Sequence, residues 1–175
     1  MGGVIIPKTF VRDPVPLIFL GGPINGAPNW QDKAVTTILS KAPELFVASP
    51  RRGVRETIAP HVLKGNESVF PRQRVWERYY LKLASRKGAI MFWLPGEEAH
   101  DPAHSYGAMT RVELGQWMTE YRFDQTVSFC LGSDGHFPGL DPIKYDLSLD
   151  APDKLPLFGS LEETCAEAIR LARRV

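Results

Sequence analysis

The stretch AIMFWL, residues 89–94, is the segment of this chain that decides its fold. An uninterrupted apolar run of this length is typical of a strand that is buried on both faces of a parallel sheet. A helix is predicted before it, over 72–84, because Val75, Tyr79 and Leu83 are spaced to share one face. A second helix is predicted after it, over 110–121. The centre of the chain is therefore a helix–strand–helix unit.

The alternation of strand and helix continues outward in both directions. Short apolar runs predict further strands over 15–20, 45–48, 127–131 and 143–147. Asn29 is placed to cap a helix after the first strand, and Ser160 with Glu163 has the spacing of a capping box before the last helix. This alternation predicts an α/β fold with a mostly parallel sheet of about five strands and helices on both faces.

Length and composition are those of one ordinary globular domain. The chain has 175 residues, of which 43% are hydrophobic and 23% charged, and its formal net charge is +1. So small a charge gives no general attraction to nucleic acid or to an anionic membrane, and no apolar run approaches the roughly 20 residues of a membrane span. Residues 1–14 are predicted to be a loose leader to a single domain over 15–175. Cys130 and Cys165 are interpreted as buried thiols, and without a signal-peptide pattern a cytoplasmic location is expected.

Ligands of parallel α/β sheets bind beyond the carboxyl ends of the strands, so functional residues are expected in the loops there. The first such loop begins with GGPI, residues 21–24, and the other two cover 95–107 and 131–140. The glycines either let the backbone approach a ligand closely or simply make a strand-to-helix turn. Their spacing matches neither a P-loop nor a dinucleotide-binding fingerprint.

Glu113 is the leading candidate for a catalytic group. It stands in TRVELG, residues 110–115, where a helix is predicted to begin at the carboxyl edge of the sheet. Thr110 and Glu113 have the spacing of a capping box, so one interpretation gives the carboxylate a purely structural role. In the other interpretation the helix dipole stabilises an ionised carboxylate in the first turn, where it can attack an anomeric carbon.

Two more residues, one on the helix before the central strand and one in that strand, each have two interpretations. Glu77 lies on the helix before the strand, and it is either a surface glutamate between Arg74 and Arg78 or a second carboxylate of the site. Trp93 lies near the end of the strand, where its indole either packs in the core or stacks on a base or a sugar.

Taken in order, these motifs resemble those of the nucleoside 2-deoxyribosyltransferase family and its nucleotide N-glycosidase relatives. FLGGP at 19–23 is similar to the strand and turn with which the family opens. WE at 76–77 matches an acidic position on the helix before the central strand, FW at 92–93 matches that strand, and ELG at 113–115 matches a helix-start signature. The resemblance covers most of the chain.

The resemblance implies a flavodoxin-like three-layer sandwich and a retaining, two-step cleavage of an N-glycosidic bond, with transfer of the sugar to another base. Glu113 would be the nucleophile that forms a glycosyl-enzyme intermediate, and Glu77 would face the base and help to handle its proton. Small-molecule nucleoside or nucleotide and free base would be the partners, without a cofactor, in a homodimer or larger assembly. The residues expected to bind substrate are Gly21, Gly22, Pro23, Ile24, Trp30, Trp93, Ser105, Tyr106, Thr110 and Asp134.

Two positions depart from the family pattern. Phe19 stands where transferases commonly have a tyrosine whose hydroxyl helps to orient the glutamate, and Gly107 stands where they often have an aspartate. Tyr106 or Ser105 is the expected substitute for the missing hydroxyl. Both departures leave hydrolysis open beside transfer.

Two loops carry further candidate ligand-binding groups. Arg51, Arg52 and Arg55 either bind a substrate 5′-phosphate, to which guanidinium groups bind in a bidentate manner, or belong to a solvated loop. HDPAH at 100–104 is not expected to bind a metal, because Pro102 opposes the helix that would place both imidazoles on one face.

Three functions therefore remain open. The first is a nucleoside deoxyribosyltransferase, and the second is a hydrolase of nucleosides or nucleoside 5′-monophosphates, which the arginines favour. The third is a non-catalytic nucleotide-binding module built on the same fold.

Overall fold

Strand β4 (Gly88–Leu94) is fully buried at the centre of a parallel sheet, as its apolar run predicts. The computed structural model describes residues 2–52, 58–150 and 155–174. Within them the sheet has six strands in the order β1-β3-β2-β4-β5-β6, every neighbouring pair being parallel. The other strands are β1 (Gly3–Ile5), β2 (Leu17–Gly21), β3 (Phe46–Ala48), β5 (Phe129–Ser133) and β6 (Leu157–Phe158).

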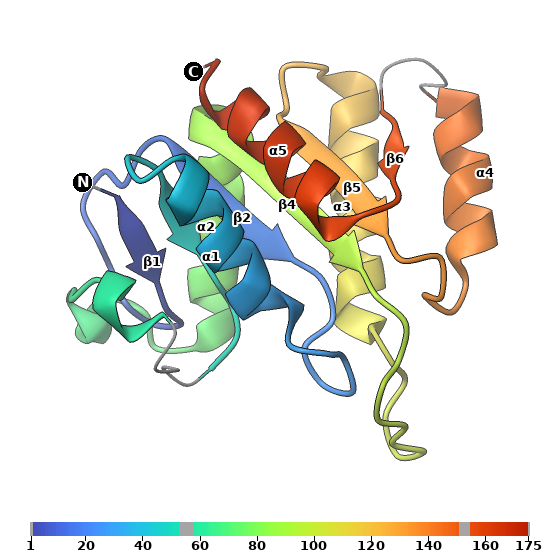
Figure 1. The fold of residues 1–175 in the computed structure, drawn as a ribbon, viewed down its shortest axis with the longest axis horizontal. Helices are drawn as coiled ribbons and strands as arrows, with labels where there is room; N and C mark the ends of the chain where they lie inside the picture. The colour runs from blue at the N-terminus through green and yellow to red at the C-terminus, as the bar shows by residue number, and fades with distance from the viewer. Residues whose placement is uncertain (1, 53–57, 151–154, 175) are drawn as a thin grey trace.

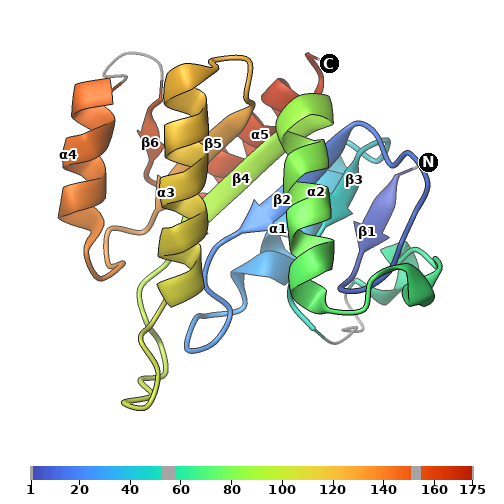
Figure 2. The same ribbon diagram turned by 180° about the vertical axis from the view of Figure 1, so that it is seen from behind.

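Helices cover both faces of the sheet and make a three-layer sandwich. Helices α1 (Trp30–Lys41) and α5 (Leu161–Ala172) lie on one face (Figure 1). Helices α2 (Gln73–Lys87) and α3 (Ala108–Phe123) lie side by side on the other, with α4 (Leu140–Asp150) beyond them toward the β6 edge (Figure 2). Two short 3-10 helices, Ala59–His61 and Glu67–Val69, lie in the long connection before α2.

The side chains of β4 divide between two cores, one under each pair of helices. Ile90, Phe92 and Leu94 belong to the core beneath α2 and α3. Ala89, Met91 and Trp93 belong to the core beneath α1 and α5. Successive residues of a strand point to opposite faces, so a strand covered on both faces needs apolar residues at every position. This explains why β4 has no polar alternation.

The strand order is flavodoxin-like, with β1 added outside β3. The chain leaves β2 for β3 on one side and then crosses to β4 on the other side of β2. Connections that leave in opposite directions open a crevice at the carboxyl ends of the two strands, which is where ligands bind in sheets of this kind. The fold therefore places the candidate loops around the β2–β4 boundary.

Two sequence-based expectations about elements are wrong. The expected loose leader over 1–14 contains β1, whose Val4 and Ile5 are fully buried and which pairs with β3. The expected last strand over 143–147 lies inside α4. Leu140 and Leu147 are buried one turn on either side of the half-buried Ile143, and this spacing suits a helix face rather than a strand.

The predicted cap at Ser160 is present and its contribution can be measured. Its hydroxyl oxygen accepts a hydrogen bond from the Glu163 backbone N–H at 3.2 Å. Ser160→Ala is expected to lower the free energy of unfolding by about 1 kcal/mol, because that amide loses its partner. Urea denaturation measures this. Ser148→Ala is the matched control, since its exposed hydroxyl donates only to its own helix, and equal losses in the two variants would contradict the capping role.

Candidate active site

A cavity of about 870 Å³ opens at the carboxyl ends of β2 and β4. The turn after β2, the loop after β3, the loop after β4 and the first turns of α2 and α3 all contribute to its walls. Most of the predicted site residues line it, namely Gly21, Gly22, Pro23, Ile24, Arg51, Arg52, Glu77, Ser105, Tyr106, Thr110 and Glu113. Phe19 also lines it. Segments that are distant in the sequence are thus brought to one site.

The structure places three predicted substrate-binding residues outside this cavity. Trp30 is buried, and its indole N–H donates to the Pro23 carbonyl oxygen at 2.9 Å. Trp93 is buried in the core beneath α1 and α5. The Asp134 carboxylate accepts hydrogen bonds from the Gly96 and His136 backbone amides and so ties two loops together. Arg55 lies outside the described residues.

Glu113 lies in the second turn of α3, and this corrects both interpretations of its position. The N-cap residue of α3 is Gly107, whose φ of 64° is left-handed, and no side chain caps this helix. Thr110 is already inside the helix, so Thr110 and Glu113 form no capping box, and Glu113 is not in the first turn. The residue is 8% exposed and borders the cavity. A carboxylate that caps nothing and faces a cavity is available for chemistry.

Arg74 joins the two candidate carboxylates. Its Nη1 donates to Oε1 of Glu113, across from α2 to α3, and lies 3.1 Å from Oε2 of Glu77. Two ordinary hydrogen bonds to one nitrogen keep two carboxylate oxygens within about 6 Å of each other. Glu77 is therefore part of the site rather than an isolated surface glutamate. Arg74 is not among the site residues predicted from the sequence, where it was considered only as a charged neighbour of a solvated Glu77.

The charges around Glu113 oppose one another. Burial raises the pKa of the Glu113 carboxyl and the nearby Glu77 charge adds to the rise, while the hydrogen bond and charge of Arg74 only partly offset it. Burial lowers the pKa of the Arg74 guanidinium, but its hydrogen bonds and charge interactions with Glu113 and Glu77 outweigh this and the net pKa is raised. The ionisation of Glu113 therefore depends on Arg74.

Gln73, also absent from the predicted site, connects the carboxylates to the arginine loop. Its amide nitrogen donates to Oε1 of Glu77 and to the Pro50 carbonyl oxygen, each at 3.0 Å. Its amide oxygen accepts from Nε of Arg52. Arg51 in turn donates to the Gln31 side chain at 3.3 Å. Both arginines line the cavity, and Arg52 is connected to Glu77 through Gln73.

The turn after β2 is held in place by residues of α1 and by close packing against β4. Gly22 has a φ of 147°, and a Cβ there would lie 2.3 Å from the Trp93 carbonyl oxygen and 2.7 Å from the Trp30 ring. The Pro23 carbonyl oxygen accepts from both Trp30 and Gln31 of α1. The position therefore requires glycine, and Trp30 supports the wall of the cavity instead of touching its contents.

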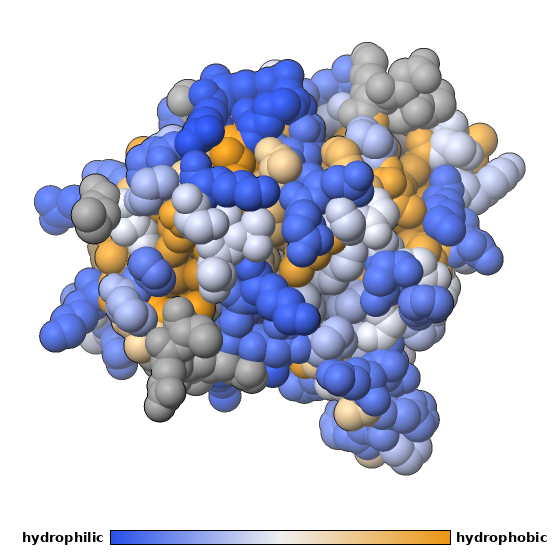
Figure 3. Space-filling model, in the orientation of Figure 1, coloured by the Kyte–Doolittle hydropathy of each residue, from blue (hydrophilic) through white to orange (hydrophobic). Residues whose placement is uncertain are grey.

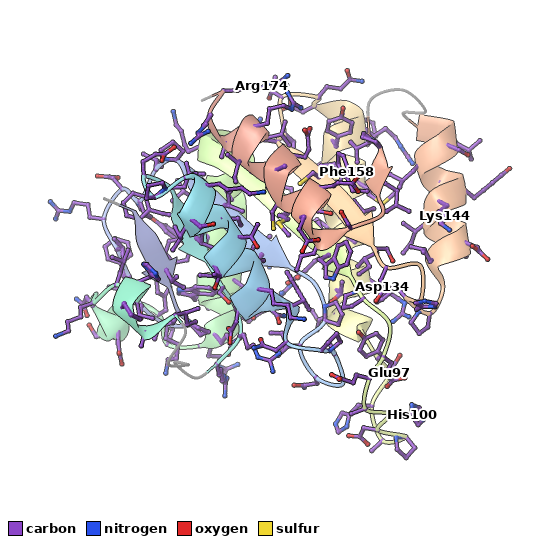
Figure 4. The ribbon with its side chains drawn as sticks, viewed as in Figure 1. Glu97, His100, Asp134, Lys144, Phe158 and Arg174 are labelled. Carbon is purple, nitrogen blue, oxygen red and sulfur yellow. The ribbon has the colours of Figure 1, made fainter. Side chains whose placement is uncertain are left out.

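The loop after β4 extends away from the body of the molecule (Figure 1), and several of its residues, from Glu97 to His104, line the cavity. Glu97 and His100 lie along it (Figure 4), and its surface is mostly hydrophilic (Figure 3). The Glu98 and Ala99 amides donate to the Gly26 carbonyl oxygen, which ties its base to the turn after β2. The described residues hold no group of three or more His, Cys, Asp or Glu side chains placed to bind a metal.

Tyr106, one of the two residues expected to orient Glu113, makes its hydrogen bonds elsewhere. Its hydroxyl lies 2.9 Å from the Pro95 carbonyl oxygen and 3.1 Å from that of Gly96, so it anchors its own loop. Burial raises its pKa, and the charges of Asp134 and Glu97 add to this rise. Ser105 lines the cavity, and within the described residues the hydrogen-bond partner of Glu113 is Arg74 instead. The group that orients Glu113 is Arg74.

Comparison with models of known protein families and with curated protein sequences gives no match for this chain. None of the described helices is long and apolar enough to cross a membrane. Cys130 and Cys165 are free and buried, as expected, and burial raises the pKa of both thiols. The argument for function therefore rests on the geometry of the site.

Proposed function

We propose that this protein cleaves the N-glycosidic bond of a nucleoside-type substrate, with Glu113 as the nucleophile. The observation that carries the proposal is that Glu113 and Glu77, which both line a substrate-sized cavity, contact one guanidinium, that of Arg74. Retaining glycosidases use two carboxyl groups about 5–5.5 Å apart, one of which attacks the anomeric carbon. The arrangement around Arg74 supports that geometry.

The chemistry divides between the two carboxylates. Of the two carboxylate oxygens of Glu113, only Oε1 accepts a hydrogen bond from the described residues. Oε2 is therefore the oxygen that attacks the anomeric carbon as the base departs. Arg74 favours the ionised form of Glu113 and so partly offsets the effect of burial. Glu77 handles the proton of the departing base, and an acceptor base or water then displaces Glu113 from the sugar.

Hydrolysis of a nucleoside 5′-monophosphate is the second candidate, and the position of Arg51 and Arg52 at the cavity favours it. One experiment separates the candidates. The protein is incubated with mixed nucleosides and nucleoside monophosphates, with and without a free base, and the bases are followed by chromatography. Exchange of bases supports transfer, and release without an acceptor supports hydrolysis. Tight binding without either product supports a binding module.

If a 5′-phosphate binds at the arginine loop, Arg51→Ala and Arg52→Ala should raise KM for the monophosphate and leave KM for the nucleoside unchanged. A hydrogen bond to a charged group contributes about 1.5–3 kcal/mol, so a selective increase of about ten-fold or more is expected. Steady-state kinetics with both substrates measure it. Arg72→Ala, at an exposed arginine outside the cavity, is the control. An equal loss for both substrates would exclude a phosphate contact.

A further inference from the structure

A second cavity, of about 390 Å³, lies in the groove between α2 and α3. These helices run side by side on the same face of the sheet (Figure 2). The cavity is lined from α2 by a row of basic residues and by Tyr79, and from α3 by Gln116, Trp117 and Glu120. This is a volume suited to a small ligand rather than to a protein or nucleic acid segment.

The basic residues form one row along α2. Arg74, Arg78, Lys82 and Arg86 all line the groove, and residues four apart share a helix face. Arg86 is paired with Asp124 at 2.7 Å, and Arg74 is paired with the cavity carboxylates. Among the described residues neither Arg78 nor Lys82 has an ion-pair partner, and both are exposed. The groove therefore holds two uncompensated cations against one acid, Glu120.

One donor on a residue that lines the groove has no hydrogen-bond partner. Trp117 is 7% exposed, and its indole Nε1 is buried without an acceptor in the part of the chain that the structure describes. A buried donor is normally paired, so this atom is an exception among the described residues. The ligand chemistry that suits the two uncompensated cations, Arg78 and Lys82, is a compact anion with several oxygens. Phosphate meets this need best, because arginine binds it in a bidentate manner.

Arg74 connects this groove to the candidate active site. It lines the groove, and the same side chain contacts Glu113 and Glu77 at the other cavity. We propose that the α2–α3 groove binds a phosphate-bearing anion, and that this anion competes with Glu113 for the guanidinium of Arg74. The binding site stands independently of catalysis, whereas its effect on turnover rests on the proposed function of Glu113.

Binding is tested with inorganic pyrophosphate by isothermal titration calorimetry at constant ionic strength. Arg78→Ala/Lys82→Ala should weaken binding by about ten-fold or more, since hydrogen bonds to charged groups are lost. Lys33→Ala/Lys41→Ala on α1 removes the same charge from the opposite face and should leave the affinity unchanged. Arg51→Ala/Arg52→Ala tests the first cavity. Loss of binding in that variant alone, equal loss in all three, or no binding to the native chain would overturn the proposal.

Coupling is tested by the ¹³C signal of the Glu113 carboxyl, assigned by its absence in Glu113→Gln. Arg74 and Glu77, both on α2, are the charged groups that contact or approach this carboxyl. Saturating pyrophosphate should move the Glu113 titration to higher pH, because burial then acts without the opposing guanidinium. In Arg74→Ala the same anion should leave the titration unchanged. A shift of equal size in both proteins, or in neither, would overturn the competition. This readout needs no turnover, so it separates failure of the groove site from failure of the proposed function.

Discussion

Glu113→Gln is expected to reduce turnover by at least about 10³-fold while the fold remains intact. Loss of a catalytic nucleophile is felt on that scale or above it, and an amide oxygen is a very poor nucleophile. The fold should tolerate the change because the amide has the same shape and Glu113 caps no helix end. Single-turnover assays of base release measure the effect, and circular dichroism with urea denaturation checks the fold.

The matched control is Glu162→Gln, at an exposed glutamate of α5 on the opposite face of the sheet. It makes the same chemical change without touching the cavity, and its turnover should equal that of the native chain. Near-native turnover in a folded Glu113→Gln protein would remove Glu113 from the mechanism.

Arg74→Ala is expected to lower turnover at neutral pH by about 10²-fold, the scale on which misplacement of a reacting group is felt. The pKa of Glu113 is already raised by burial, and loss of Arg74 removes what opposes that rise. A smaller fraction of Glu113 is then ionised at neutral pH. The acidic limb of the pH–rate profile should therefore move to higher pH, and part of the lost rate should return as the pH rises.

Arg74→Lys retains the charge but not the planar fork, so it should restore the position of the acidic limb better than it restores the rate. Arg72→Ala, at the exposed start of the same helix, is the control for a general loss of charge. A lower rate with an unmoved acidic limb would show that Arg74 acts by packing alone.

Four of the six strands in the described residues were predicted from the sequence, whereas β1 and β6 were not. Predicted and observed bounds of β2, β3, β4 and β5 agree within two residues, because burial on both faces forces apolar runs that end where the strands end. Strand β1 has three residues, too few to show a period, so its apolar residues were assigned to a leader. Helix α4 was missed because its apolar residues lie among charged ones in a stretch that also alternates.

The candidate site was predictable in its positions and less so in its contacts. Glu113 and the glycine turn were placed together because parallel strands end at one edge of the sheet, and Glu77 was added only from the resemblance of its motif. The contact between Arg74 and Glu113 joins residues 39 apart in the sequence, on helices whose spacing no local pattern specifies. Trp30 and Trp93 were misplaced for a related reason. An indole near a strand end can face either a ligand or a core, and only the packed helix decides which.

The extended loop after β4 also matters for anyone who wishes to alter the molecule. Its base is fixed by the Glu98 and Ala99 amides on Gly26, while its outer residues, His100 and Asp101, are exposed. On one side the chain continues into β4 and on the other into α3, and β4 remains paired with β5 whatever the loop does. The loop is thus the natural point at which to insert a reporter or to divide the chain into two fragments. Because Glu97 and His104 line the first cavity, a fluorophore inserted between them would sense whether that cavity is filled.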